Sequence, residues 1–416
     1  MINNLIFVAI ILLSVFPVGC SAQQMANLTT IIMDGKKVYV FPIKKKGKFF
    51  LRKNYDLCGK IFAIPEGVEL VAKGGTFMNG TLIGRGTTIE GDKALFDHVK
   101  ITGDWNVPNI STTLFKDLTY DNSLKDVFAL SSSVIDNKIT VEKGMYKVTT
   151  TPFNEALLIK SNTELIISGV IQLLPNDFSG CYVLGIKKAK NVVIRGDGKV
   201  EGDRFCHIGT AGEWGHGINV DSSDSVLISE ITISNCWGDC IYVGNNSSNI
   251  TISGCKLRKG RRQGISITSG HKIKVINCII SDIRGTDPQY AIDVEPNKNE
   301  CVNDVLIENV RVNNCYGGFS SWGGAPGSTI GTIMLRRCSV KGTKANYPVR
   351  FTIGKEVVIE DCVFETGKQP GVFTDVVNRV KVKNNVIHST NPKAVHIRRV
   401  IKREELNNKI IKKENG

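Results

Sequence analysis

Two carboxylates lie close together in the segment Tyr290-Ala291-Ile292-Asp293-Val294-Glu295. If this segment is a β-strand, Asp293 and Glu295 share one face and lie about 6.8 Å apart, because side chains alternate along a strand. Such a pair suits a general acid and a general base in glycoside hydrolysis. It equally suits one hard cation such as Ca²⁺, the only cofactor that the sequence suggests. A solvated strand face, or a pair that stabilises the turn before Pro296, is the non-catalytic alternative.

Several polar residues near this pair are candidates for holding a substrate. The guanidinium of Arg262 could bind a substrate carboxylate in a bidentate manner, although a plain surface charge explains it as well. Tyrosine rings stack on sugars or, if activated, relay a proton. The predicted substrate-binding residues are Arg262, His216, Tyr242, Tyr290, Asp221 and Gln263.

Four short segments with alternating apolar residues carry these candidates. They are His216 to Asp221, Asp239 to Gly244, Gln263 to Thr268 and Tyr290 to Glu295. If their Ile and Val residues point inward, a column of small residues points outward and forms the floor of a groove on which a chain-like ligand could lie. That column consists of Gly217, Cys240, Gly264 and Ala291. Polar residues beside it would form the walls of a sugar-binding groove.

A repeated pattern explains how these strands are positioned. Alternating apolar pairs begin at Val226, Ile250, Ile273, Val305, Ile333, Val357 and Val380, so they are 24, 23, 32, 28, 24 and 23 residues apart. A repeat near 23 residues with turn-rich spacers is typical of a β-solenoid, in which each coil stacks on the next at about 4.8 Å. The sequence therefore predicts an all-β fold, a single-stranded right-handed parallel β-helix with one short helix over Leu124 to Val134.

The cysteines follow the same repeat. Cys255, Cys278, Cys338 and Cys362 occupy one position of the pattern and are predicted to point inward as core thiols. A disulfide framework is the alternative for an exported chain, but the eleven cysteines after Cys20 are an odd number and their spacing is that of the repeat.

Two coils are longer than the others and border the same four strands. The first insertion runs from Gly202 to His216, and the second begins at Arg284 and returns after Asn297. Long loops without structure of their own are often functional. We therefore expect the working site between them, with chance variation in loop length as the alternative.

The strand array resembles the pectin-degrading β-helix superfamily, which includes polygalacturonases and pectate lyases. The segments that carry the resemblance are Asn235 to Ile241, Arg261 to Ser266 and Ile292 to Asn297, which look most like uncharacterised bacterial β-helix repeat proteins. The resemblance implies a polysaccharide substrate. Only one carboxylate of the polygalacturonase Asp pair is present, Asp239, and it must lie in the turn before its strand to face outward. The family's catalytic set is therefore incomplete, which leaves the reaction open.

The chain begins with an apolar segment, Leu5 to Val18, that has the length of a secretory signal core. The following Gly19-Cys20 resembles a lipobox, although Pro17 replaces the usual Leu. We expect an exported protein, attached at Cys20 to the outer membrane or cell surface, or else cleaved after Ala22 and periplasmic or secreted. This anchor is the only expected contact with a membrane.

The formal net charge of +14 fits a polyanionic, uronate-type glycan as partner, or simply a Lys-rich background with a basic tail. No motif supports nucleic-acid binding. The predicted organisation is a signal peptide over 1–22, N-terminal β-rich coils and the helix over 25–135, the β-helix over 136–397 and a basic tail over 398–416. Two function classes remain: a glycoside hydrolase or polysaccharide lyase with Asp293, Glu295 and Asp239 as catalytic residues, and a non-catalytic glycan-binding or adhesin module.

Overall fold

The computed structural model describes residues 28–43, 47–343 and 347–412. Contacts divide the chain into two compact units, with the boundary between Asn137 and Lys138. The predicted signal segment over 1–22 and the lipidation candidate Cys20 lie outside the described residues. No helix in the described part of the chain has the length and apolar character needed to cross a membrane.

Unit 1 contains an 8-stranded sheet, followed by a short strand, a 3-10 turn and one helix. The strands are β1 (Thr30–Met33), β2 (Lys36–Val40), β3 (Gly47–Leu51), β4 (Tyr55–Asp56), β5 (Ile61–Ala63), β6 (Val68–Ala72), β7 (Phe77–Glu90), β8 (Phe96–Trp105) and β9 (Asn109–Ser111). The helix α2 spans Ser123–Ala129 and is shorter than predicted. The chain leaves the helix there because the amide of Asn137 bonds to the backbone of Ser132 in the next turn.

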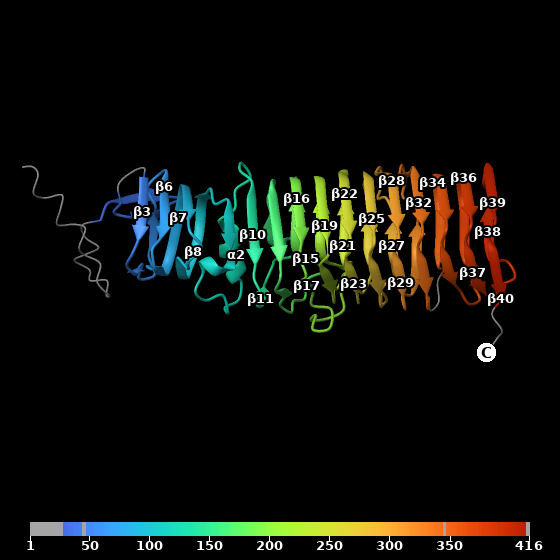
Figure 1. Cartoon of the computed structure of the whole chain (residues 1–416), viewed down its shortest axis with the longest axis horizontal. Helices are drawn as coiled ribbons and strands as arrows, with labels where there is room; N and C mark the ends of the chain where they lie inside the picture. Colours follow the sequence, from blue (N-terminus) through green and yellow to red (C-terminus); the bar gives the residue numbers. More distant parts are fainter. Residues whose placement is uncertain (1–27, 44–46, 344–346, 413–416) are drawn as a thin grey trace, which may run out of the picture. The chain divides into compact units, whose positions relative to one another are not determined.

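Unit 2 is a stack of coils (Figure 1), and the parallel pairings between successive coils define three sheets, here numbered 1 to 3. Sheet 1 carries the predicted site. Its strands are β12 (Glu155–Ile159), β15 (Gly180–Lys187), β18 (Trp214–Asp221), β21 (Ile241–Gly244), β24 (Ile265–Ile267), β27 (Tyr290–Val294), β30 (Gly317–Ser321), β38 (Val395–Arg398) and the first parts of β34 (Val349–Glu360) and β36 (Val372–Lys383).

Sheets 2 and 3 complete each coil. Sheet 2 contains β10 (Asn137–Val141), β13 (Thr163–Ile167), β16 (Lys190–Arg195), β19 (Asp224–Ser229), β22 (Ser247–Ser253), β25 (Gly270–Ile276), β28 (Cys301–Glu308), β31 (Thr329–Ile330), β32 (Thr332–Arg336), β39 (Lys402–Leu406) and the second parts of β34 and β36. Sheet 3 contains β11 (Met145–Val148), β14 (Val170–Leu173), β17 (Lys199–Glu201), β20 (Thr232–Ser234), β23 (Lys256–Arg258), β26 (Ile279–Ser281), β29 (Arg311–Asn313), β33 (Ser339–Lys341), β35 (Val363–Glu365), β37 (Val386–Ser389) and β40 (Lys409–Lys412).

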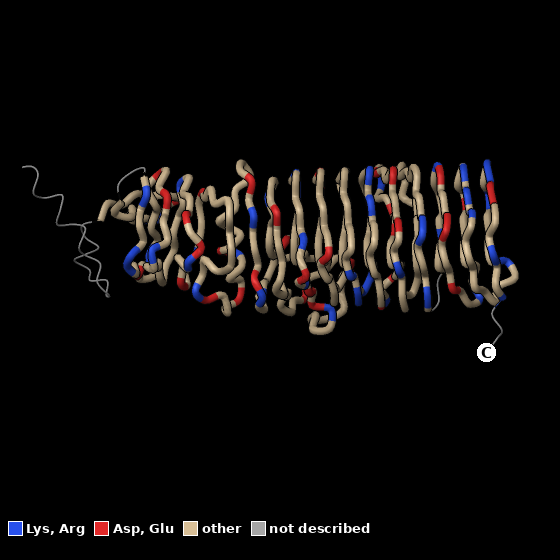
Figure 2. The backbone as a smooth tube through the Cα atoms, viewed as in Figure 1, with Lys and Arg blue, Asp and Glu red and all other residues tan. Residues whose placement is uncertain are grey.

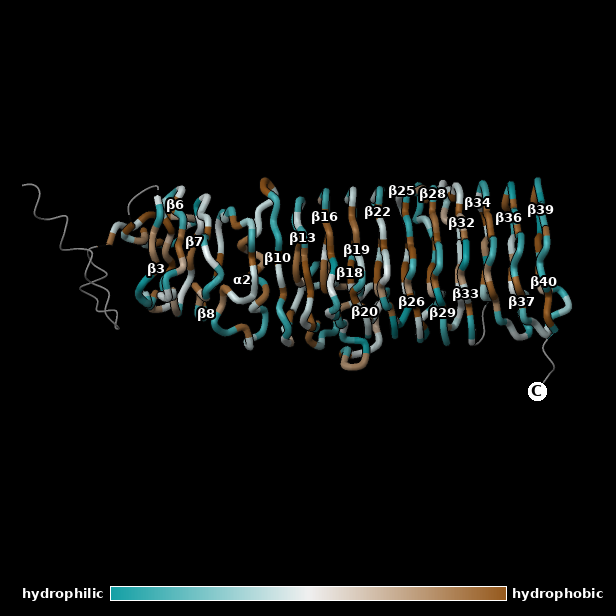
Figure 3. The backbone as a smooth tube through the Cα atoms, in the orientation of Figure 1, coloured by the Kyte–Doolittle hydropathy of each residue, from teal (hydrophilic) through white to brown (hydrophobic). Residues whose placement is uncertain are grey.

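The predicted repeat register is confirmed in sheet 2. Val226 pairs with Ile250, Ile250 with Ile273 and Ile273 with Val305, and the same series continues to Val380. These residues are buried, and hydrophobic and hydrophilic positions alternate along the strands of unit 2 (Figure 3). Short alternating strands therefore bury one face in the core of each coil, as the period of two requires.

The thiol ladder also points inward as predicted. Cys255, Cys278, Cys338 and Cys362 are at most 2% exposed and form no disulfide. In the following coils Asn385 takes the same position, where its side chain accepts a hydrogen bond from the Cys362 N–H and donates one to the Ile359 carbonyl. A polar residue is accommodated here because both kinds of hydrogen-bonding group on its side chain find partners.

The stretch that the sequence predicts as a basic tail contributes further strands instead. β39 pairs in parallel with β36, and β40 pairs with β37, so residues 402–412 form part of the stack. Lys and Arg gather on these strands, as Figure 2 shows. Their side chains are exposed, so the charge is compatible with a regular strand.

Candidate functional site

The four predicted strands lie side by side in sheet 1, in the register that the sequence implies. Ile218 pairs with Ile241, Ile241 with Ile265 and Ile265 with Ile292. This register brings residues from four successive coils onto one outer face. Asp239 lies just before β21, in the turn position that an outward-facing carboxylate requires.

The guanidinium of Arg262 is the centre of this face. Its Nη1 lies 3.3 Å from Asp239, its Nε 3.7 Å from Glu213 and its Nη2 3.5 Å from Glu295. Burial alone would lower the pKa of Arg262, but the surrounding carboxylates, first of all Asp239, outweigh it and raise the pKa. Arg262 is therefore a fixed positive charge and a poor candidate for a general base.

Asp293 is deeply buried, close enough for its charge to interact with this guanidinium. It is 1% exposed, accepts a hydrogen bond from Gln263 Nε2 at 2.8 Å and accepts another from the Ser320 hydroxyl. Gln263 is held in turn by the Tyr290 N–H, which donates to its Oε1 at 2.9 Å. Burial raises the pKa of Asp293 despite these donors. Asp293 is thus outward in register but closed off from solvent.

Glu295 is the accessible member of the predicted pair. Its side chain is 37% exposed, and that of Glu213, which also contacts Arg262, is 32% exposed. Burial, and then the charge of Asp293 together with a hydrogen bond to it, raise the pKa of Glu295 to about 7. A carboxyl group with this pKa carries a proton in much of the population at neutral pH, which is the state that a general acid needs.

His216 is enclosed between two tyrosine rings. Its imidazole stacks on Tyr182 with centroids 5.5 Å apart and on Tyr242 at 5.0 Å. Its Nδ1 accepts the Asp239 N–H at 3.2 Å, and burial lowers the pKa of His216 to about 4. His216 is therefore a neutral, buried side chain that positions Asp239. The partly exposed rings of Tyr182 and Tyr242 beside it are the groups that a ligand could contact.

The small-residue column is not the groove floor that the sequence suggests, and this prediction is wrong. Cys240 and Ala291 are fully buried. A Cβ added to Gly217 would lie 2.5 Å from the Ile233 side chain and 2.9 Å from the Cys236 sulfur, so this column points into the core. Each residue of this column and the Ile that follows it are both buried, so strict alternation does not hold there. The outer face consists of the next polar column instead, which contains Asn219, Tyr242, Ser266 and Asp293.

The first insertion is fixed to the site by aromatic contacts. The ring of Trp237 is stacked on His207 at 3.9 Å and carries the Arg261 guanidinium 3.7 Å from its centroid. Trp237 Nε1 donates to the Ala211 carbonyl, and Arg261 donates to that of Gly212. These contacts hold the insertion in place, so that its residue Glu213 lies next to Arg262.

A cavity of about 250 Å³ opens next to the carboxylate pair. Two residues that the sequence analysis did not single out, Trp322 and Arg350, line it. The full lining is Pro288, Tyr290, Asp293, Glu295, Ser320, Ser321, Trp322 and Arg350. No sequence pattern pointed to Trp322 or Arg350, because their place depends on the register of β30 and β34, one and two coils beyond β27.

The other predicted residues have separate roles. Asp221 accepts a hydrogen bond from the neighbouring Ser222 hydroxyl and has no recorded contact with Arg262. Tyr290 is buried, and burial raises its pKa well above the usual value. Within the described ranges, no three His, Cys, Asp or Glu side chains are arranged to hold a metal ion. The sequence suggested Ca²⁺ between Asp293 and Glu295, and in the structure the positive charge that contacts Glu295 is the Arg262 guanidinium.

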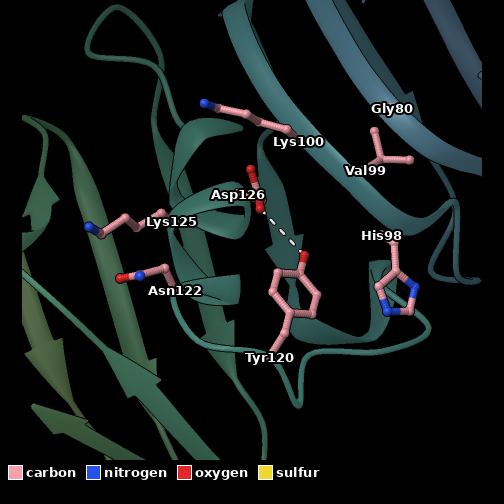
Figure 4. Close-up of a pocket in the computed structure, with 8 residues that line it drawn as sticks. All are labelled: Gly80, His98, Val99, Lys100, Tyr120, Asn122, Lys125 and Asp126. Atoms are coloured by element: carbon pink, nitrogen blue, oxygen red, sulfur yellow. Dashed lines mark hydrogen bonds between the residues drawn. The ribbon is translucent and has the colours of Figure 1, made fainter. Parts of the chain in front are cut away.

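A larger hollow of about 460 Å³ lies in unit 1, lined by His98, Tyr120, Lys100, Lys125 and Asp126 among others (Figure 4). Asp126 is the carboxylate of this lining, and it is already engaged. It accepts the Ile101 N–H at 2.9 Å and the Tyr120 hydroxyl at 3.4 Å. Because this lining has no second carboxylate, we place the candidate active site in unit 2.

Comparison with known proteins agrees with this architecture. Residues 167–299 match the family model described as a right handed beta helix region. The fold is a right-handed parallel β-helix. The solved tailspike of E. coli bacteriophage HK620, in complex with pentasaccharide, is similar to it at 15% identity and a TM-score of 0.50, over 72% of this chain and 61% of the tailspike.

Two Bacillus subtilis (strain 168) proteins match part of the β-helix. The SPbeta prophage-derived uncharacterized protein YorA is 35% identical over 162 residues, which is 33% of this chain and 27% of YorA. The uncharacterized protein YclG is 30% identical over 163 residues, 34% of this chain and 28% of YclG. The matched region therefore spans little more than a quarter of either relative.

Proposed function

We propose that the outer face of sheet 1 binds a polysaccharide and hydrolyses it. The observation that carries this proposal is the arrangement of Glu213 and Glu295, two accessible carboxyl groups that contact the neighbouring Nε and Nη2 atoms of the Arg262 guanidinium. Each carboxyl group has Arg262 as its ion-pair partner, so the two acids are brought to one place on the outer face from different coils. The HK620 tailspike, which has a similar fold, was solved with a pentasaccharide, so this fold is compatible with glycan binding.

In the proposed reaction, Glu295 donates its proton to the glycosidic oxygen as the C–O bond breaks. A water molecule adds to the anomeric carbon and gives its proton to Glu213, after which the two groups exchange protons with solvent. Asp293 and Asp239 remain buried. They hold Arg262 in place, and Asp293 keeps Glu295 protonated. This division of roles follows from exposure, because a substrate can reach only the accessible carboxyl groups.

The lyase alternative would use an Arg base to abstract a proton from a uronate. Arg262 does not favour that chemistry, because the acids around it raise its pKa. The adhesin alternative needs the same groove without turnover. We further propose, from the sequence, that the protein is exported and anchored at Cys20, and that the glycan is acidic.

The experiment is a screen of the purified full chain on a polysaccharide panel, reading reducing ends and absorbance at about 235 nm, where unsaturated elimination products absorb. A hydrolase yields reducing ends without absorbance, a lyase yields both and a binding module yields neither but retains glycan. Glu295→Gln should lower turnover by about 100- to 10,000-fold, the usual contribution of a general acid. Glu230→Gln, an exposed carboxyl in the same unit, is the matched control and should behave like the parent. Turnover by Glu295→Gln at the parental rate would exclude the proposed role.

A further inference from the structure

Arg350 lies on the same outer column as Asp293. Ser320 pairs with Asp293 in one direction and with Arg350 in the other, so the guanidinium lies two coils beyond the carboxylate pair. Both Asp293 and Arg350 line the 250 Å³ cavity, and Arg350 is the one cation in its lining.

The hydrogen-bonding groups of Arg350 are not fully used by the protein. Its Nε is buried and has no hydrogen-bond partner. No acidic side chain in the described part of the chain forms an ion pair with it. By contrast, Arg262 is surrounded by carboxylates. Arg350 as a whole is half-buried and lines the cavity, so an anionic ligand can reach its guanidinium and supply an acceptor that the protein does not.

An aromatic platform stands beside this guanidinium. Trp322 is 47% exposed and follows β30, where its backbone N–H donates to the Val294 carbonyl, and it lines the same cavity as Glu295. The Arg350 guanidinium lies 5.6 Å from the Trp322 ring centroid and 5.9 Å from that of Tyr347. An indole face packs well against the apolar face of a pyranose ring, and a guanidinium fork matches a planar anion.

We propose that Trp322 and Arg350 form a subsite for a sugar that carries an anionic group, either a carboxylate or a sulfate ester. The ring lies on Trp322 and the anionic group accepts hydrogen bonds from Arg350. The carboxylates around Arg262 repel an anion, so within the cavity the negative group of the ligand belongs at the Arg350 end. This inference rests on the proposed glycan-binding function and adds the position and charge of one sugar unit.

Binding is measured by calorimetry with the full chain, using three trisaccharide probes: a trigalacturonate, a sulfated trisaccharide and a neutral, carboxyl-reduced trigalacturonate. For Arg350→Gln we expect roughly 10- to 100-fold weaker binding of the anionic probe, the loss of a charge-assisted hydrogen bond, and unchanged binding of the neutral probe. Arg350→Lys should recover part of the affinity. Trp322→Leu should weaken binding of all probes that bind the parent. Arg311→Gln, an exposed arginine on β29 with no recorded ion pair, is the control.

The outcomes separate this subsite from the proposed function. If Arg350→Gln binds the anionic probes like the parent, the subsite is overturned while hydrolysis through Glu295 stands. Binding of neutral probes alone by the parent would also overturn it. If the parent binds no glycan at all, the proposed function fails and the subsite fails with it. Thermal unfolding of each variant shows that weaker binding does not come from misfolding, and the preference between the two anionic probes identifies the anion.

Discussion

Arg262 Nη2 lies 3.5 Å from Glu295 Oε2, although the two residues belong to different coils. The same guanidinium contacts Asp239 and Glu213. One cation therefore ties together three acids from several coils, two of them accessible and one buried. The accessible carboxyl groups can contact a ligand, whereas buried Asp239 serves to hold the Arg262 side chain in place.

The first prediction concerns pH. Glu295 acts in its protonated form, so turnover should fall as pH rises through about 7, the raised pKa of the group. The folded state also holds this proton more tightly than the unfolded chain, whose value is near 4.5. The stability contribution of Glu295 is therefore present below that value and is lost as pH rises toward 7. A pH–rate profile and a series of unfolding curves measure both effects, and an alkaline limb that is absent in this range would contradict the assignment.

The second prediction is that Arg262→Ala lowers the free energy of unfolding by about 3–5 kcal/mol at neutral pH, because it leaves buried Asp239 without its counter-charge. The deficit should shrink as pH falls, because protonation of the unpaired carboxyl removes the buried charge. Denaturant unfolding at several pH values measures this.

The control for this change is Arg195→Ala, which breaks an exposed pair with Glu164. That pair should contribute no more than about 1 kcal/mol. Equal losses in the two variants, or a deficit for Arg262→Ala that does not depend on pH, would mean that burial of Asp239 is not the cause.

The coil register and the inward thiols could be predicted from sequence because they depend on short-range alternation. The apolar residues of each repeat mark the strand face that points inward, and each coil repeats the pattern. Examples are Val226, Ile250 and Cys255. The groove floor could not be predicted in this way. Gly217 and Cys240 each come directly before the first inward-facing Ile of their coil, and both consecutive residues are buried there, so the period of two does not hold.

The composition of the site was only partly predictable for a different reason. Asp293 and Glu295 share a strand, so their proximity follows from spacing. Glu213 reaches Arg262 only because the insertion is fastened to Trp237, and Arg350 reaches the cavity through pairing over two further coils. The solvent exposure of Asp293 could not be predicted either, because its burial depends on Gln263 and Ser320 from neighbouring coils.

The third prediction concerns the ten cysteines from Cys181 to Cys362, all of them free thiols. Only Cys206 and Cys301 are exposed. In the native protein a maleimide should label these two quickly and the other eight only after unfolding, because the buried thiols are enclosed in the core. Peptide mapping by mass spectrometry gives the result, and rapid native labelling of Cys278 would argue against the inward ladder.

The fourth prediction tests export. If Gly19-Cys20 is a lipidation signal, radiolabelled palmitate should appear on the parent protein expressed in a bacterial host and be lost in Cys20→Ala. Cys206→Ala, which changes an exposed cysteine far along the chain, should keep the label. A parent protein that is exported but never labelled would favour cleavage after Ala22.

The last prediction separates the roles of the two neighbouring acids. Asp293→Asn removes a charge that raises the pKa of Glu295, second only to burial. The pKa of Glu295 should therefore fall, and the alkaline limb of the pH–rate profile should move to lower pH. The variant should also be less stable, because an amide that keeps the Ser320 bond directs its NH₂ group toward the Gln263 donor. Ser320→Ala is the comparison: it removes a donor to Asp293 but no charge, so the limb should move little. If Asp293→Asn abolished turnover at every pH while its fold remained intact, Asp293 would itself be a reacting group, and the buried acid would have to gain access to the ligand.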